Sequence, residues 1–123
     1  MDIPVIETPR LRLRGWSASD AEALAEINAD AEFARYLADG KPIDAAASWR
    51  VLAILAGHWQ LRGFGLWLVE RKDDGVFLGR VGLWEPEGWP GTEIGWGISP
   101  RYWGQGYAPE AARAAMEWAF SEL

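Results

Sequence analysis

The chain has 123 residues, half of them hydrophobic, and a formal net charge of −6 at pH 7. This length suits a single domain with a genuine core, and the acidic balance argues against a nucleic-acid-binding protein, which usually carries a basic patch. There is no cysteine and only one histidine, His58, so we expect neither a disulfide framework nor a metal centre. The N-terminus lacks the segments of a signal peptide, and no apolar run approaches the roughly 20 residues that a membrane span requires. The expectation is a soluble cytoplasmic protein.

The first predicted element is a strand from Ile6 to Trp16, in which Leu11 and Leu13 alternate with basic residues. This alternation is typical of a half-buried strand with one face in water. The basic residues are Arg10, Arg12 and Arg14. Three arginines could also bind phosphate, but a solvated strand face is the simpler interpretation.

Two helical segments are predicted next. Ser19 and Glu22 have capping-box spacing, so a helix should begin there and bury Leu24, Ile27 and Ala31. Residues 28–37 are predicted as a turn with a short second helical piece, which residues 38–42 end.

A longer helix should run from its N-cap Asp44 to about Leu61. Its predicted apolar stripe consists of Trp49, Leu52, Ala53, Ala56 and Trp59. His58 lies at the edge of this stripe, and we interpret it as structural or surface rather than catalytic.

Three strands are predicted at 66–71, 76–84 and 92–98, and the Asp73-Asp74-Gly75 turn between the first two indicates an antiparallel meander. In the last strand, Glu93, Gly95 and Gly97 share one face because strand side chains alternate. Two glycines in register suggest that something approaches this backbone closely.

The last strand leads into a loop, 99–106, and a helix from Tyr107 onward. Gly104 and Gly106 remove Cβ atoms that would keep a ligand off the backbone, and the first N–H groups of the helix lack internal partners. Together these features suggest a phosphate cradle. For the two glycines alone, a plain strand-to-helix turn is the alternative interpretation.

The final helix combines small residues, which allow close packing on a sheet, with a charged face. On that face, Glu110, Arg113 and Glu117 are predicted to form helical ion pairs, as a solvated surface rather than a site.

Two common glycine-rich phosphate motifs do not fit this loop. A dinucleotide fingerprint needs a third glycine where this chain has Pro109, and a P-loop needs a G-K-[ST] sequence that is absent. Instead, Arg101-x-x-Gly104-x-Gly106, placed between the Glu93 strand and Ala108-Pro109-Glu110-Ala111, resembles the acetyl-CoA signature of the GCN5-related N-acetyltransferases (GNAT).

The opening segment, Glu7-Thr8-Pro9-Arg10-Leu11-Arg12-Leu13-Arg14, is similar to the first strand of one GNAT branch, which modifies ribosomal-protein N-termini and related amines. The resemblance implies a single α+β domain over residues 1–123. Its expected three-layer fold is a mixed, mostly antiparallel sheet flanked by helices, in the order β-α-α-β-β-β-α. The implied function is acetyl transfer from acetyl-CoA to a primary amine, on a small molecule or a protein N-terminus.

The resemblance also implies roles for individual residues. Glu93 corresponds to a glutamate that often serves as the catalytic base, although it could instead organise hydrogen bonds across a splayed sheet. Ile98 and Ser99 would pair with the pantetheine arm, and Arg101 occupies the first position of the motif. The pyrophosphate amides would come from Trp103, Gly104, Gln105, Gly106 and Tyr107.

Family members normally continue past this helix with further strands and a helix. We therefore expect a chain that lacks the family's C-terminal third, after the coenzyme-binding helix. The alternative function is a non-catalytic module that binds coenzyme A or a protein partner, since aromatic residues such as the nine tryptophans are enriched at interfaces. Exposed strand edges invite pairing, so self-association is also expected.

Overall fold

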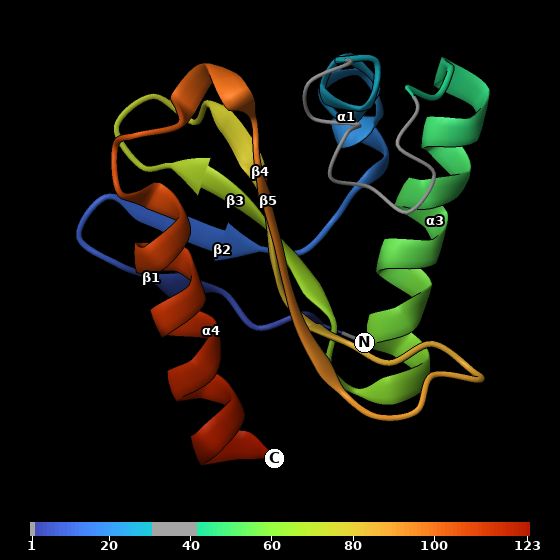
Figure 1. Ribbon diagram of the computed structural model, residues 1–123, viewed down its shortest axis with the longest axis vertical. Coiled ribbons are helices and arrows are strands. Elements are labelled where there is room, and N and C mark those ends of the chain that lie inside the picture. The colour runs from blue at the N-terminus through green and yellow to red at the C-terminus, as the bar shows by residue number, and fades with distance from the viewer. Residues whose placement is uncertain (1, 31–41) are drawn as a thin grey trace.

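The computed structural model of the protein describes residues 2–30 and 42–123. Its centre is a five-stranded sheet in the order β1-β2-β3-β4-β5, with every neighbouring pair antiparallel. Helices α1 and α3 cover one face and α4 covers the other (Figure 1). The strands are β1 (Ile6–Glu7), β2 (Leu11–Arg14), β3 (Leu66–Arg71), β4 (Phe77–Trp84) and β5 (Glu93–Ile98). The helices are α1 (Ala21–Asn28), α3 (Ala45–Arg62) and α4 (Tyr107–Glu122), with short 3₁₀ turns η1 (Ala18–Asp20) and η2 (Pro100–Tyr102).

This three-layer arrangement confirms the predicted α+β fold and the predicted meander of β3, β4 and β5. None of the described helices is long and apolar enough to cross a membrane.

The predicted opening strand is wrong in one respect, because it is split into the hairpin β1–β2. Ile6 pairs with Leu13 across the hairpin. The Thr8 N–H donates to the Leu11 carbonyl at 2.9 Å and closes the turn, in which Pro9 has no N–H to offer a ladder. Arg10 therefore lies in a turn and not on a strand face.

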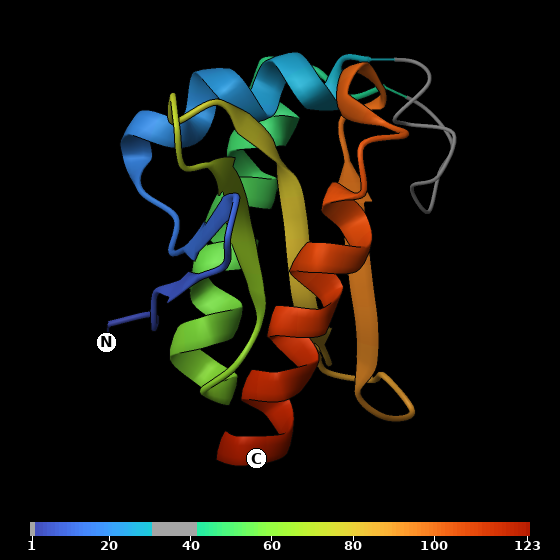
Figure 2. The ribbon, with the colours of Figure 1, turned by 90° about the vertical axis from the view of Figure 1, so that its left-hand side faces the viewer.

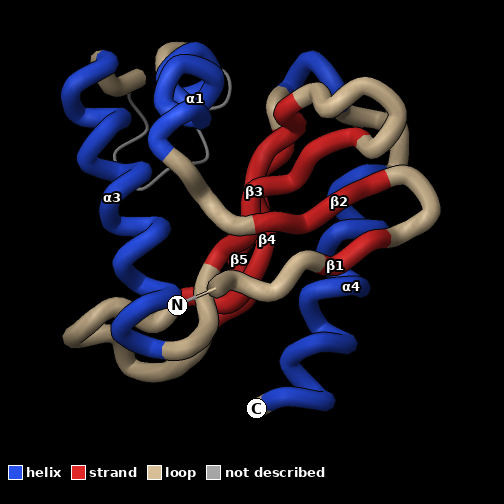
Figure 3. Tube along the Cα trace, turned by 180° about the vertical axis from the view of Figure 1, so that it is seen from behind, coloured by secondary structure: helices blue, strands red, loops and turns tan. Residues whose placement is uncertain are grey.

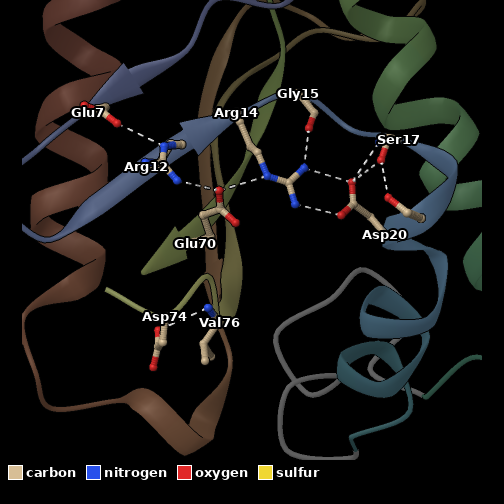
Figure 4. Close-up of polar contacts among 10 residues, drawn as sticks. Glu7, Arg12, Arg14, Gly15, Ser17, Asp20, Glu70, Asp74 and Val76 are labelled. Carbon is tan, nitrogen blue, oxygen red and sulfur yellow. Dashed lines mark hydrogen bonds and ion pairs between the residues drawn. The ribbon is translucent and has the colours of Figure 1, made fainter. Parts of the chain in front are cut away.

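The arginines of β2 bind carboxylates while their side chains stay partly exposed, at 36% for Arg12 and 30% for Arg14. Arg12 and Arg14 lie 3.3 and 3.1 Å from the same oxygen of Glu70, which is buried on β3. Arg14 also lies 2.9 Å from Asp20. Figure 4 shows this network, which joins β2 and β3 to the start of α1.

The capping box lies two residues earlier than predicted, and its N-cap Ser17 begins η1, whereas Asp20 is the N-cap of α1. The Ser17 N–H donates to the Asp20 carboxylate at 2.8 Å, and the Asp20 N–H donates to the Ser17 carbonyl at 3.0 Å. The capping pair is therefore Ser17 and Asp20, because Arg14 holds the Asp20 carboxylate at this position. Leu24 and Ile27 are buried as predicted. The prediction for Ala31 and the short second helical piece falls on residues 31–41, outside the described residues.

Helix α3 begins and ends close to the predicted residues. The Asp44 carboxylate accepts the Ala47 N–H at 2.8 Å, and Gly63 closes the other end with φ 79°. The predicted stripe was partly wrong, since Trp49 is 57% exposed. The buried face consists of Ser48, Leu52, Leu55, His58 and Trp59. This face begins at Ser48, whose hydroxyl accepts a hydrogen bond of 2.8 Å from Asn28 of α1.

His58 is a structural residue, as the sequence suggested. Its Nδ1 lies 2.8 Å from the Phe64 carbonyl, and its Nε2 accepts the Glu85 N–H at 3.0 Å. The ring stacks on Trp84 with a centroid separation of 4.3 Å. Both nitrogens are therefore used to connect α3 with the loops before β3 and after β4.

Two apolar clusters lie on the two faces of the sheet. The larger cluster joins α4 to the strands through Tyr107, Ala111 and Ala115, and includes Trp59 and Trp67. Figure 2 shows α4 crossing in front of the sheet between the β1–β2 hairpin and β5. The smaller cluster, on the α1 and α3 face, is formed by Leu24, Ile27, Leu52, Leu55 and Leu66.

The glycines of β4 are required by close backbone contacts. A Cβ at Gly79 would lie 2.0 Å from the Gly97 carbonyl oxygen of β5. At Gly82 it would lie 2.1 Å from the Gly65 oxygen. These positions therefore exclude any side chain.

We predict that Gly79→Ala lowers the free energy of unfolding by more than about 3 kcal/mol, because backbone atoms must move to admit the methyl group. Gly95→Ala is the control, since its Cβ would meet only Leu66 Cδ2 at 3.7 Å. Urea unfolding of both variants measures the difference. Equal stability of the two variants would contradict the close approach of the β4 and β5 backbones at Gly79.

A second prediction concerns Asp20. Burial raises the pKa of this carboxyl, but hydrogen bonds from Arg14 and Ser17 more than offset that effect and hold the pKa below its ordinary value. The ionised form therefore favours folding. Its contribution should be complete above the unfolded pKa of about 3.9 and lost as the pH falls through the lower folded-state value.

Asp20→Asn should accordingly cost about 1–3 kcal/mol at pH 7. The difference in free energy of unfolding between wild type and variant should vanish as the pH falls below 4. Asp73→Asn, an exposed turn residue, serves as the control in urea unfolding at each pH. A gap that stays constant down to the lowest pH would refute this role of the Asp20 charge.

Candidate functional site

The segment between β5 and α4 contains a 3₁₀ turn, whereas the sequence predicted an irregular loop. In η2, the Tyr102 N–H donates to the Ser99 carbonyl at 2.9 Å. The Trp103 N–H donates to the Pro100 carbonyl at 3.2 Å. Pro100 suits the first position of such a turn, where an N–H has no partner. The turn carries the chain from the end of β5 to the two glycines.

Gly104 and Gly106 both have φ +80°, a conformation that costs other residues roughly 1–2 kcal/mol. At Gly104, the position of a Cβ has no atom within 4 Å. The glycine loop, defined here as residues 103–106, is thus open to solvent and presents bare backbone.

Helix α4 begins immediately after Gly106, which caps it. The N–H groups of Gly106, Tyr107 and Ala108 have no acceptor within the helix, and Pro109 has no N–H. These donors lie at the positive end of the helix dipole, which favours an anion. Ala108 was not among the predicted residues, although its place in the first turn of the helix could have indicated it.

Strand β5 has one ladder partner among the described residues, and its other edge is open. The Ser99 N–H donates to the Leu78 carbonyl at 2.7 Å. Because the bonds of an antiparallel ladder alternate, the backbone groups of Trp96 and Ile98 face the open edge. The Ile98 carbonyl already accepts the Trp103 indole N–H at 2.6 Å. Both groups of Trp96 and the N–H of Ile98 are therefore exposed to an added strand.

This arrangement bears on two predicted residues. Ser99 has its N–H and its carbonyl bonded within the chain, so it could pair with a ligand only by exchanging those bonds. Trp96 was not predicted, although the alternation of β5 would have placed it at the same edge as Ile98.

Arg10 also belongs to the site, and the sequence analysis missed it. Its Nη1 donates to the Gln105 carbonyl at 2.8 Å, and its Nε donates to Glu110 at 2.7 Å. Its guanidinium lies 4.5 Å from the centroid of the Tyr107 ring. Figure 3 shows the β1–β2 hairpin beside α4, where this contact forms.

Glu110 points toward the hairpin, so the predicted series of helical ion pairs with Arg113 was wrong at this position. Burial raises the pKa of Glu110, but hydrogen bonds from Thr8 and Arg10 lower it below its ordinary value. The carboxylate is therefore ionised at neutral pH.

Glu93 lies at the opposite end of β5 from the glycine loop. Its side chain is exposed, and it is five residues, or about 17 Å of strand, from Ile98. It pairs with Trp84 and shares its face with Gly95, on the side of Leu66 and the α1–α3 layer. Arg101 is exposed on η2.

A cavity of about 410 Å³ lies between α1 and the glycine-loop end of the sheet. Its lining includes Ile27, Phe77 and Tyr102, with Glu26 and Arg101 among the charged residues. The described residues contain no group of three His, Cys, Asp or Glu side chains placed to hold a metal ion.

Taken together, a strand with an open edge runs into bare glycine backbone and the positive end of a helix. This geometry defines a class of α+β proteins that can bind an elongated ligand with an anionic group at one end.

Comparison with known proteins identifies the family. Residues 10–123 match the family model of the acetyltransferase (GNAT) domain. The chain belongs to this family, which confirms the resemblance seen in the sequence.

Among three similar proteins, one curated relative and one solved structure are named as acetyl-transferring enzymes. The chain is 44% identical over 62 residues to the uncharacterized protein YkkB of Bacillus subtilis. The matched residues make up 49% of this chain and 36% of that protein. It is 31% identical to the FsC-acetyl coenzyme A-N(2)-transacetylase of Aspergillus fumigatus, over 98% of this chain and 54% of that protein. An acetyltransferase crystal structure from Agrobacterium tumefaciens superposes with TM-score 0.84 at 30% identity, over 98% of this chain and 68% of that one. The chain thus spans about half or less of the length of these two curated relatives.

Proposed function

We propose that this chain binds acetyl-CoA and transfers its acetyl group to a primary amine. The observation that carries the proposal is the continuity between the open edge of β5 and the unpaired N–H donors of Gly106, Tyr107 and Ala108. An extended arm can pair along the edge while the phosphates at its end meet the helix. The bare space at Gly104 admits such a ligand without a clash.

The residues expected to hold the coenzyme follow from this geometry. The amides from Gly104 to Ala108 would receive the pyrophosphate, and Trp96 and Ile98 would pair with the pantetheine arm. Arg101, exposed on η2, would add a positive charge at this end of the sheet. When bound, acetyl-CoA supplies a thioester carbonyl that an amine can attack.

Glu93 is our candidate for the base. A primary amine is protonated near neutral pH and cannot attack until a carboxylate, directly or through water, takes its proton. The attack then forms a C–N bond and breaks the C–S bond, and the leaving thiolate takes a proton from solvent. The Glu93 carboxylate makes no hydrogen bond or ion pair with the residues that the structure describes, so it is available.

The amine would approach Glu93 on the α1–α3 side of β5, since the cavity beside α1 lies at the opposite, glycine-loop end of the sheet. Both a small-molecule amine and a protein N-terminus fit this chemistry. We also propose that the chain without coenzyme self-associates through the β5 edge, beside which Trp96 is 59% exposed, so that coenzyme and a second chain would compete for that edge.

Calorimetric titration with coenzyme A tests the binding step. The chain should bind, and Gly106→Val should weaken binding at least tenfold, since the strained φ alone costs more than about 1 kcal/mol and the side chain would press on the Arg10 guanidinium that packs against this peptide. Gly91→Val, at an exposed loop glycine with no atom near its Cβ, should bind normally. Circular dichroism checks that both variants fold. Normal binding by Gly106→Val would show that the cradle is misassigned.

Acetylation of a panel of amines tests the base. Glu93→Gln should keep its affinity for coenzyme A but slow turnover by about 10²–10⁴-fold. Glu87→Gln, an exposed glutamate in the preceding loop, is the control and should keep the wild-type rate. If Glu93→Gln also keeps that rate at neutral pH, the base lies elsewhere.

A further inference from the structure

We propose that Arg10 and Glu110 form a clamp that sets the orientation of the glycine loop for anion binding. This inference rests on the proposed function of the same loop. Arg10 is a positioning residue in it, because it acts through the backbone of Gln105 and Gly106 rather than on the ligand. The sequence analysis had assigned both Arg10 and Glu110 to solvated faces.

The contacts converge on one guanidinium. Arg10 donates through Nη1 to the Gln105 carbonyl and through Nε to Glu110, at 2.8 and 2.7 Å. The Arg10 backbone N–H and the Thr8 hydroxyl also donate to Glu110, at 3.0 and 2.5 Å. The turn of the N-terminal hairpin is thereby fixed to the first turn of α4, about a hundred positions along the chain.

The bond to Gln105 determines where the next amide points. No cis peptide bond occurs among the described residues, so the Gln105 carbonyl and the Gly106 N–H lie on opposite sides of one planar unit. With the carbonyl directed at Arg10, the Gly106 N–H must point away from Arg10. A Cβ at Gly106 would lie 3.4 Å from Arg10 Nη2, so the guanidinium packs against this peptide.

The pair also controls charge. Glu110 is ionised and lies in the first turn of α4, where an uncompensated carboxylate would oppose a phosphate. Arg10 neutralises it at 2.7 Å. Arg10 therefore has two separable effects, which are orientation of the Gly106 amide and neutralisation of Glu110.

Because the two effects are separable, a set of variants should show a definite order of affinities for coenzyme A. Arg10→Met should lose both effects. Arg10→Met with Glu110→Gln should recover the part due to charge and remain weaker than wild type. Arg10→Lys keeps a cation but has no planar fork to reach both acceptors, so it should also bind less tightly than wild type. Arg12→Met is the matched control, because Arg12 binds Glu7 and Glu70 and does not contact the loop.

Two measurements on the folded chain decide the matter. Amide hydrogen exchange, read by mass spectrometry on peptides covering residues 107–114, where the first helical hydrogen bond runs from the Glu110 N–H to the Gly106 carbonyl at 3.3 Å, should be at least about tenfold faster in Arg10→Met and unchanged in Arg12→Met. The Kd for coenzyme A should rise about tenfold in Arg10→Met, as expected if the binding-competent loop population falls to about a tenth. Melting temperatures identify any variant that loses the fold.

The outcomes separate the clamp from the function that it serves. If wild type binds no coenzyme A, the proposed function fails, and the exchange result alone decides the clamp. Wild-type exchange in Arg10→Met would overturn the clamp, as would equal changes in Arg12→Met. Wild-type affinity in Arg10→Lys would also overturn it, because charge alone would then suffice.

Discussion

The docking of α4 on the sheet is the contact on which the site depends. Small residues such as Ala111 and Ala115 are buried and let the helix approach the strands closely, while Tyr107 anchors its first turn in the same core. Helix packing of this kind is rigid because side chains in a core interdigitate at high density. The position of α4 therefore determines where its unpaired N–H donors point. These donors lie close to the end of β5 in the chain. The 3₁₀ turn η2 and the glycine loop form the short connection between that strand and the helix.

The open edge of β5 is the second half of the site. Backbone groups at a strand edge retain their hydrogen-bonding capacity, and they are satisfied by water until another strand or an extended ligand replaces it. Here that edge leads directly to the helix terminus, so one ligand can use both. Neither feature would be distinctive alone, since helix termini and strand edges are common. Their continuity through Ile98, with Trp103 bridging the two, is what supports the proposed coenzyme site.

Much of this architecture could be predicted from the sequence, because it follows from local rules. Asp44 and Gly63 mark the ends of α3 through capping chemistry, and the Asp73-Asp74-Gly75 turn fixes the β3–β4 hairpin. The glycine loop was predicted from its spacing and from the family that it resembles. In each case, the residues that determine the structure are neighbours in the chain.

The errors share a different origin. Arg10 was placed on a strand because alternation was extended across Pro9, and its real partners lie about a hundred residues away. Glu110 was paired along its own helix, although a hairpin packed against that helix offers better donors. Trp96 was not predicted, and its backbone rather than its side chain is what the edge exposes. Periodicity reports which face is buried, but it does not report which distant element supplies a hydrogen bond.

The most direct test of the coenzyme site is to map it by NMR on the uniformly ¹⁵N-labelled chain. Coenzyme A is titrated in, and the amide shift changes are followed residue by residue. Our account predicts the largest changes at Gly104 to Ala108, with further changes along β5 at Trp96 and Ile98 and little change in α3. Saturable changes that cluster elsewhere, or no saturable change at the glycine loop, would contradict it.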